Sequence, residues 1–135
     1  MLGASYEWIG SPKKAKDAYS HELEALQRAE PLKKEDAKAQ AEMGLLYSKV
    51  QQRSGALTHL QTALAIAPND PSVLSIAGEA YENFGERQLA IAYIENAIRN
   101  GWDRERLKRN PDLQKFLGDP EVKKRLAAVK GPENK

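Results

Sequence analysis

The feature that most constrains the fold is a similarity between two stretches of the chain, which align with each other at a 34-residue offset. Gly44 and Tyr47 in the first stretch correspond to Gly78 and Tyr81 in the second. The correspondence then continues, with Val50, Ala56, Leu60, Ala63 and Leu64 matching Phe84, Ala90, Ile94, Ala97 and Ile98. A fixed period of this length is typical of chains built from stacked structural units that bury their apolar faces against one another.

Each unit is expected to contain helices. Ala, Leu, Glu and Lys dominate the composition and β-branched residues are scarce, which favours helix. Asp70 and Pro71 are suited to cap and begin a helix, and Gly85 and Gly101 are suited to end one. Gly44 and Gly78 are expected where two helices cross, because only a small side chain lets their backbones approach closely.

The two units share a pattern of small and aromatic residues. A glycine is followed by Tyr three residues on, Ala twelve on, a large apolar residue sixteen on and Ala nineteen on. This pattern resembles the tetratricopeptide repeat, although Gln40, Met43, Leu74 and Ala77 replace the Trp and Leu of the family signature. The resemblance implies an all-α fold, in which antiparallel helix-turn-helix repeats stack as a right-handed α-solenoid that ends in short C-terminal capping helices.

The beginning of the chain shows the same spacing, in Gly3, Tyr6, Ile9, Gly10, Ala15 and Tyr19. The interval from Gly3 to Gly44 exceeds the period by about two helical turns, so a second helix is expected to continue through residues 22–28. Glu22 stands where the other units have Ala. We therefore expect a fragment of a longer array, with a homodimer contact through an incompletely covered edge formed by Leu2, Tyr6, Trp8 and Ile9.

After Trp102 the period stops and short helices are expected, over residues 104–109 and then from Asn110-Pro111 and Asp119-Pro120. Their apolar residues are expected to cover the last repeat at Ala90, Ile94, Ala97 and Ile98, as a cap. These residues are Leu107, Leu113, Phe116, Leu117, Val122 and Leu126. The ending, Gly-Trp and then Asn-Pro-Asp-Leu and Asp-Pro-Glu-Val, resembles that of tetratricopeptide arrays in bacterial serine/threonine protein kinases, adenylate cyclases and transcriptional regulators. The resemblance implies a module of a larger bacterial signalling protein.

The predicted organisation is a single domain. It comprises a truncated first repeat (1–36), a second repeat (37–70), a third repeat (71–102), capping helices (103–129) and a disordered tail (130–135).

The sequence offers little catalytic chemistry. His21 and His59 are isolated, cysteine is absent, and the glycines form no phosphate-binding loop. Glu79, Glu82 and Glu86 have helical spacing and are interpreted as a solvated or groove-facing acidic strip rather than a catalytic pair. We expect no enzymatic activity, no metal and no cofactor.

The resemblance places the first helix of each repeat along a concave groove, which is the expected protein-binding site. Its predicted residues are Glu7, Trp8, Lys38, Ala41, Leu45, Ser48, Lys49, Ser75, Glu79, Glu82 and Asn83. Trp8 is a candidate hot spot, with packing against a missing turn as the alternative. Chaperone-binding members of the family bind a C-terminal carboxylate with Lys and Asn at fixed groove positions. In this chain those positions hold Ala41, Glu42, Leu45, Ser72 and Ile76, so a receptor for a chaperone tail is not expected.

Charge and hydropathy argue against nucleic acid and membrane as partners. The net charge is +2, and residues 103–135 carry ten basic and six acidic residues, too few for a typical nucleic-acid surface. No apolar run reaches the length of a membrane span, and the lack of cysteine fits a reducing compartment. The resemblance to bacterial signalling proteins implies a cytoplasmic location, in a parent protein that is itself cytoplasmic or membrane-tethered. Two functions remain: a scaffold that binds a peptide or protein in the groove, or a structural array that associates with itself.

Overall fold

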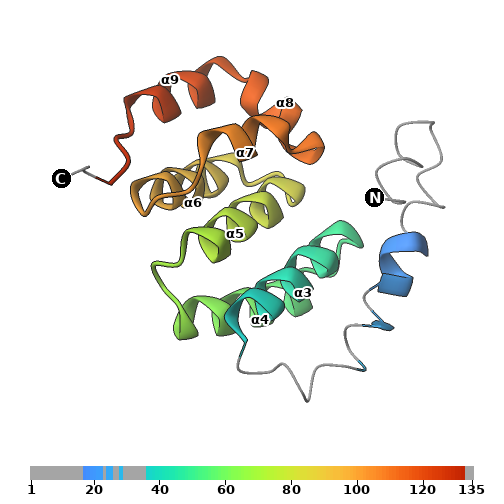
Figure 1. Cartoon of the computed structure of the whole chain (residues 1–135). Helices are drawn as coiled ribbons and strands as arrows, with labels where there is room; N and C mark the ends of the chain where they lie inside the picture. The colour runs from blue at the N-terminus through green and yellow to red at the C-terminus, as the bar shows by residue number, and fades with distance from the viewer. Residues whose placement is uncertain (1–16, 23, 26–27, 29–35, 133–135) are drawn as a thin grey trace.

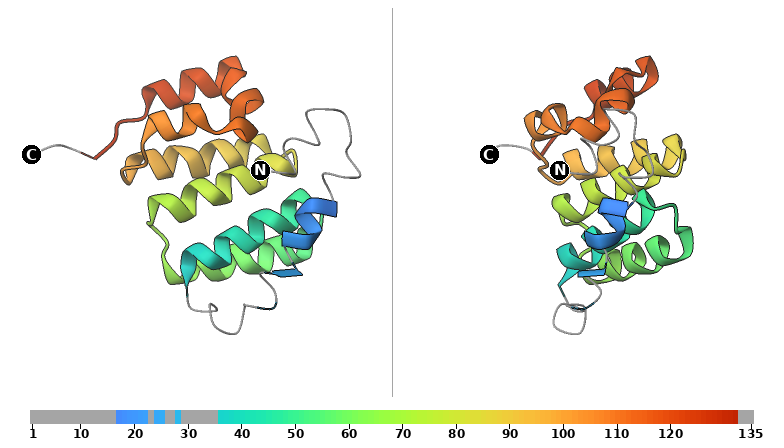
Figure 2. Two further views of the ribbon diagram at one scale, coloured as in Figure 1. Left: turned by 45° about the vertical axis from the view of Figure 1, so that its right-hand side comes forward. Right: turned by 90° about the vertical axis from the view of Figure 1, so that its right-hand side faces the viewer.

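The computed structural model describes residues 17–22, 24–25, 28 and 36–132, and this part of the chain contains helices and no strand. The helices are α3 (Ala37–Lys49), α4 (Arg53–Ile66), α5 (Pro71–Asn83), α6 (Arg87–Arg99), α7 (Arg104–Arg109), the 3-10 helix η1 (Pro111–Leu113), α8 (Gln114–Gly118) and α9 (Pro120–Ala128). The pairs α3/α4 and α5/α6 and the group α7 to α9 lie in layers that follow chain order (Figures 1 and 2). The predicted all-α class is confirmed.

The two helix pairs have equivalent boundaries. Helices α3 and α4 begin at Ala37 and Arg53, and α5 and α6 begin at the positions that the repeat period makes equivalent, Pro71 and Arg87. The Asp70 side chain accepts hydrogen bonds from the amides of Ser72 and Val73, and Pro71 occupies the first turn, as predicted. Gly85 and Gly101 follow α5 and α6 with φ of +76° and +105°, which confirms them as glycines of helix ends.

Gly44 and Gly78 lie at close helix crossings. A Cβ atom on Gly44 would lie 2.7 Å from Leu60 Cγ, and a Cβ atom on Gly78 would lie 2.7 Å from Ile94 Cδ1. Because Leu60 and Ile94 are themselves equivalent positions of the repeat, the same contact is made twice, between α3 and α4 and between α5 and α6. The predicted role of both glycines is confirmed.

The C-terminal helices cover α6. The largest core cluster joins Ile91, Ile94 and Ile98 of α6 to residues of every helix that follows it. These residues are Leu107, Leu113, Phe116, Val122 and Leu126, with Leu117 packed against the cluster. The residues predicted to form a cap therefore do cover α6, and the helices that carry them begin at the predicted residues. We call α7, η1, α8 and α9 together the cap.

Residues 17–22, 24–25 and 28 are helical and lie beside the C-terminal end of α3 (Figure 1). Tyr19 is 1% exposed and packs with Met43, Leu46 and Val50. The predictions for residues 1–16, including groove residues Glu7 and Trp8 and the homodimer edge, lie outside the described residues, as does the tail from residue 133. Within the described part of the chain, no helix is both long and apolar enough to cross a bilayer.

Candidate binding site

A polar pocket of about 360 Å³ lies where α3 and α5 end. Its lining comes from four parts of the chain: Tyr19, Lys49 and Gln51, Asn83, and Pro111 with Asp112. Helices α3 and α5 pack side by side, which brings their C-terminal ends together, and the segment after α7 closes one side. The pocket therefore depends on contacts between residues far apart in the sequence.

Lys49 organises one wall of this pocket. Its side chain is only 7% exposed, and its Nζ atom lies 3.1 Å from Asp112 Oδ2 and 3.9 Å from Glu79 Oε2. The same ammonium group stands 4.7 Å from the ring centroid of Tyr19, within cation–π distance. One lysine thus connects Tyr19, α3, α5 and η1.

Glu79 is the buried partner of this lysine. Burial raises the pKa of the Glu79 carboxyl above its ordinary value, and Lys49 and the Asn110 amide only partly offset that effect. The Asn110 Nδ2 atom donates a hydrogen bond of 3.0 Å to Glu79 Oε1. Since Asn110 also caps η1, the carboxylate fixes the segment that closes the pocket.

Two amide side chains join the turns after α3 and α5. Asn83 Nδ2 donates to Ser48 Oγ at 3.0 Å. Gln51 Nε2 lies 3.2 Å from the backbone carbonyl oxygens of both Ser48 and Asn83. These bonds hold the two amide groups in the lining of the pocket, where they can also pair with a peptide backbone.

Gln51 has an unusual backbone conformation. Its φ of 61° is the only positive value at a non-glycine position in the described residues. Gly85 occupies the equivalent place after α5, so Gln51 adopts a conformation in which glycine would be less strained. Such strain often accompanies functional residues. Gln51 is not among the residues predicted for the site, although its alignment with Gly85 at the 34-residue offset marks the position in the sequence.

The structure brings together only some of the predicted groove residues. Lys49 and Asn83 line the pocket, and Ser48 and Glu79 lie behind it as their bonding partners. Lys38 is exposed at the other end of α3 and lies away from these residues.

Four of the predicted positions are buried and do not form an open wall. Ala41 has no exposed surface because it packs against Ala63 and Val73, so its assignment to the groove is wrong. Ser48 is likewise fully buried, and Ser75 and Glu79 are each 7% exposed. Leu45 is half-buried against the cluster around Leu60. The reason is that α5 packs directly on α3, so this face of each helix contacts its neighbour.

The three glutamates interpreted as a solvated or groove-facing acidic strip each pair with a basic side chain, so they do not form a freely solvated strip. Glu79 pairs with Lys49, Glu82 with Arg87, and Glu86 with Arg53. Their charges are therefore largely neutralised within the fold.

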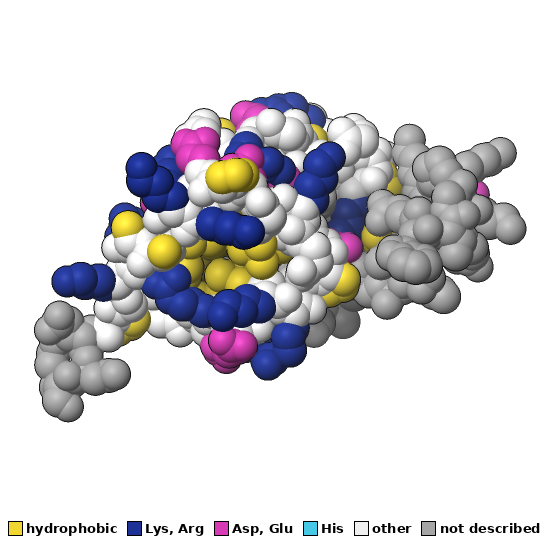
Figure 3. Space-filling model, turned by 90° about the horizontal axis from the view of Figure 1, so that it is seen from above, with side chains coloured by type: hydrophobic (Ala, Val, Ile, Leu, Met, Phe, Trp, Pro, Cys, Tyr) yellow, Lys and Arg dark blue, Asp and Glu magenta, His cyan; other side chains and the backbone are white. Residues whose placement is uncertain are grey.

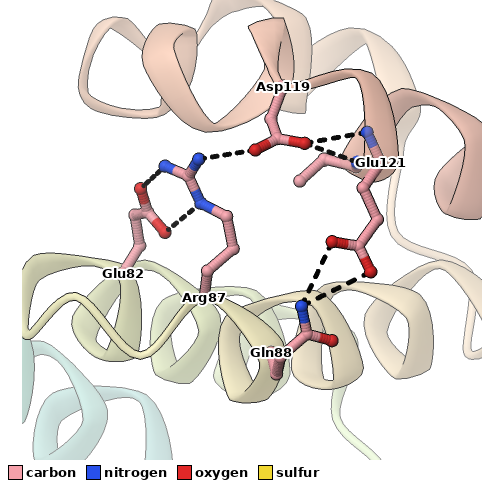
Figure 4. A network of polar contacts seen from close by, with 6 residues as sticks. Glu82, Arg87, Gln88, Asp119 and Glu121 are labelled. Carbon is pink, nitrogen blue, oxygen red and sulfur yellow. Dashed lines mark hydrogen bonds and ion pairs between the residues drawn. The ribbon is translucent and has the colours of Figure 1, made fainter.

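Glu82 belongs to a network that joins the cap to α6 (Figure 4). Arg87 binds Glu82 through two nitrogens and donates to Asp119 Oδ2 at 2.9 Å. This hydrogen bond from Arg87 and the two from the amides of Glu121 and Val122 hold the pKa of Asp119 below its ordinary value. Asp119 is the N-cap of α9, so the network fixes the start of that helix.

Neither histidine lies in the pocket. His59 hydrogen-bonds to Gln40 at 2.7 Å and stacks on Tyr47, whereas the His21 side chain is exposed. In the described residues, no group of His, Asp or Glu side chains has the arrangement of a metal site.

The pocket lining thus combines hydrogen-bonding side chains, an ion pair and one aromatic residue, Tyr19. A comparison of the chain with protein-family models and with curated proteins finds no match.

Proposed function

We propose that this chain is a non-catalytic protein-interaction module of the tetratricopeptide type, and that it binds a peptide segment in the pocket at the ends of α3 and α5. The observation that carries the proposal is the strained Gln51, which lines the pocket and whose Nε2 atom donates to the backbone carbonyl of Asn83. The 34-residue spacing of helix boundaries and of the crossings at Gly44 and Gly78 supports the repeat assignment.

The charge balance indicates the kind of ligand. Lys49 is already paired with Asp112 and Glu79, so a terminal carboxylate would compete with two internal ones. The amides of Gln51 and Asn83 present neutral polar groups, which suit the backbone of an extended peptide. We therefore propose an internal peptide segment rather than a C-terminus as the ligand, and a larger bacterial signalling protein as the parent of this module.

The proposal can be tested by selecting binders from a random peptide library with the purified chain. Gln51→Ala and Asn83→Ala should each lower the affinity for the selected peptides roughly three- to tenfold, because each removes a hydrogen-bonding group worth about 1 kcal/mol of binding free energy. Gln61→Ala and Asn69→Ala change the same residue types at exposed positions outside the pocket and serve as matched controls. Equal loss in variants and controls, or no loss in either, contradicts the proposal.

A structural role is the second candidate, because Lys49, Glu79, Asp112 and Asn110 satisfy one another without a ligand. In that case the repeats would stack end to end and the pocket would have no ligand. Sedimentation of the same variants separates the two roles. The scaffold proposal requires that Gln51→Ala and Asn83→Ala lose peptide while their oligomeric state stays that of the parent.

A further inference from the structure

A second pocket lies on the outer surface of the cap, away from the one just described. Its volume is about 340 Å³, and its apolar part is formed by Ile98 at the end of α6, Leu107 of α7, Leu117 of α8 and Leu126 of α9. Leu107 and Leu126 are only 4% and 7% exposed, so these side chains are recessed rather than protruding. The size is at the lower end of the range for ligand pockets.

Basic side chains surround this apolar floor. Figure 3, which looks down onto the cap, shows a hydrophobic hollow bordered by Lys and Arg. Arg104, Lys108 and Lys123 belong to the pocket lining. The rim is therefore cationic where the floor is apolar.

Most of this positive charge is not neutralised within the fold. The Arg104 guanidinium donates to the backbone carbonyls of Leu126 and Val129, which hold it in place without a carboxylate. Lys108 lies 3.3 Å from Glu105, but the two side chains are 68% and 63% exposed and such pairs are weak. Among the residues that the structure describes, Lys123 has no ion-pair partner.

We propose that this pocket docks a protein segment in which one or two large apolar side chains are flanked by Asp or Glu. The apolar side chains would fill the floor, and the flanking carboxylates would meet Lys123, Lys108 and Arg104. A membrane surface fits less well, because binding to a bilayer requires apolar side chains that project from the surface. This docking surface is independent of the pocket at α3 and α5 and goes beyond the proposed function.

The test uses the full chain and a fluorescent synthetic peptide with a Leu-Phe pair flanked on both sides by Glu, measured by fluorescence anisotropy. Ala127, an exposed residue of α9, lines the pocket, whereas the neighbouring exposed Ala128 does not. Ala127→Trp should fill the pocket and abolish binding, whereas Ala128→Trp should bind like the parent. Thermal melts of both variants establish that they are folded.

Charge reversal gives a second matched pair. Lys123→Glu should weaken binding of the peptide about fivefold or more. Lys124→Glu makes the same change in net charge and should have a clearly smaller effect on binding. A peptide with Lys in place of Glu should not bind. Asn83→Ala should leave binding unchanged, which separates this proposal from the one above.

Three results would overturn the proposal. The first is absence of binding by the parent chain, and the second is equal binding of the Glu- and Lys-flanked peptides. The third is equal behaviour of the variants at 127 and 128. Vesicles rich in phosphatidylglycerol test the alternative ligand. If the parent chain binds no peptide but co-sediments with these vesicles, and Ala127→Trp does not reduce the co-sedimentation, the basic rim binds a lipid surface instead.

Discussion

The pairs α3/α4 and α5/α6 share their boundaries and their glycine crossings, yet their second helices are buried to different extents. Helix α4 buries only Ala56, Leu60 and Ala63. Helix α6 buries the three equivalent residues and also Ile91 and Ile98. The positions equivalent to those two isoleucines hold Leu57 and Leu64, which are half-buried although they are just as apolar.

The difference comes from the neighbours of each pair. The cap packs its apolar residues on α6, whereas no described helix after α4 covers α4 in the same way. The shared 34-residue pattern therefore sets how the two helices of a pair cross, and the adjacent element sets how much of the second helix is buried.

The largest expected effect on stability comes from weakening the cap, which should remove the extra burial of α6 relative to α4. Phe116 is 1% exposed in the core between the cap and α6. Phe116→Ala should lower the free energy of unfolding by about 3–5 kcal/mol, because it leaves a cavity at that interface. Chemical denaturation measures the change.

The control for this change is Leu89→Ala, on α6 itself but 43% exposed, which should change the stability by no more than about 0.5 kcal/mol. If the two variants are equally stable, Phe116 does not form part of a core between the cap and α6.

The second prediction compares the stability cost of a large side chain at the two glycine crossings. Gly78→Leu should overpack α5 against α6 and cost about 1–3 kcal/mol. Gly44→Leu should cost more, because its new Cβ would meet the branch carbon of Leu60 and lie 3.1 Å from the Ala56 carbonyl oxygen. At Gly78 the nearest atom is the terminal Cδ1 of Ile94, which can move more easily, and the carbonyl oxygen of Ala90 is 3.3 Å away.

Thermal melts of the two variants, with the exposed substitution Gly118→Leu as control, test this order. A Cβ atom at Gly118 would meet nothing within 4 Å. An unchanged melting temperature for Gly78→Leu would contradict the close crossing.

The third prediction compares the two turns. Gly85→Gln places a glutamine in the left-handed conformation and should cost about 1–2 kcal/mol. Gln51→Gly should cost less, since relief of backbone strain offsets the loss of the two hydrogen bonds from the Gln51 amide. Urea denaturation of both variants measures the contrast, and equal losses would show that the strain at Gln51 is negligible.

The smallest expected effect is a dependence of stability on pH. It arises at Glu79 of α5, whose equivalent position in α3 holds the non-titrating residue Leu45. Burial raises the pKa of Glu79 above its ordinary value of 4.5, so the folded state holds this proton more tightly than the unfolded state. The resulting stabilisation is complete below about pH 4.5 and is lost as the pH rises through the folded-state pKa.

The parent should therefore gain stability relative to Glu79→Gln as the pH is lowered from neutral towards 4.5. Melting temperatures measured across that range test the sign. Glu42→Gln, which removes the charge of an exposed residue on α3, controls for the change in net charge. A constant difference between the parent and Glu79→Gln would refute the role of burial.

The sequence by itself determined the local structure. The 34-residue period located both helix crossings, because a residue without a Cβ atom recurs where the second helix packs closely on the first. Asp70, Asn110 and Asp119 cap helices as predicted, since capping depends only on residues within one turn. The apolar spacing after residue 103 likewise predicted the residues that cover α6.

Only the tertiary structure decided the candidate sites. Ala41 and Glu79 belong to the same predicted groove, but the packing of α5 on α3 buries both. Lys49 finds its partners Glu79 and Asp112 on other elements, α5 and η1, and no local pattern predicts such ion pairs. Helix periodicity tells which residues share a face, whereas exposure of that face depends on what packs against it, and this is a property of the whole fold.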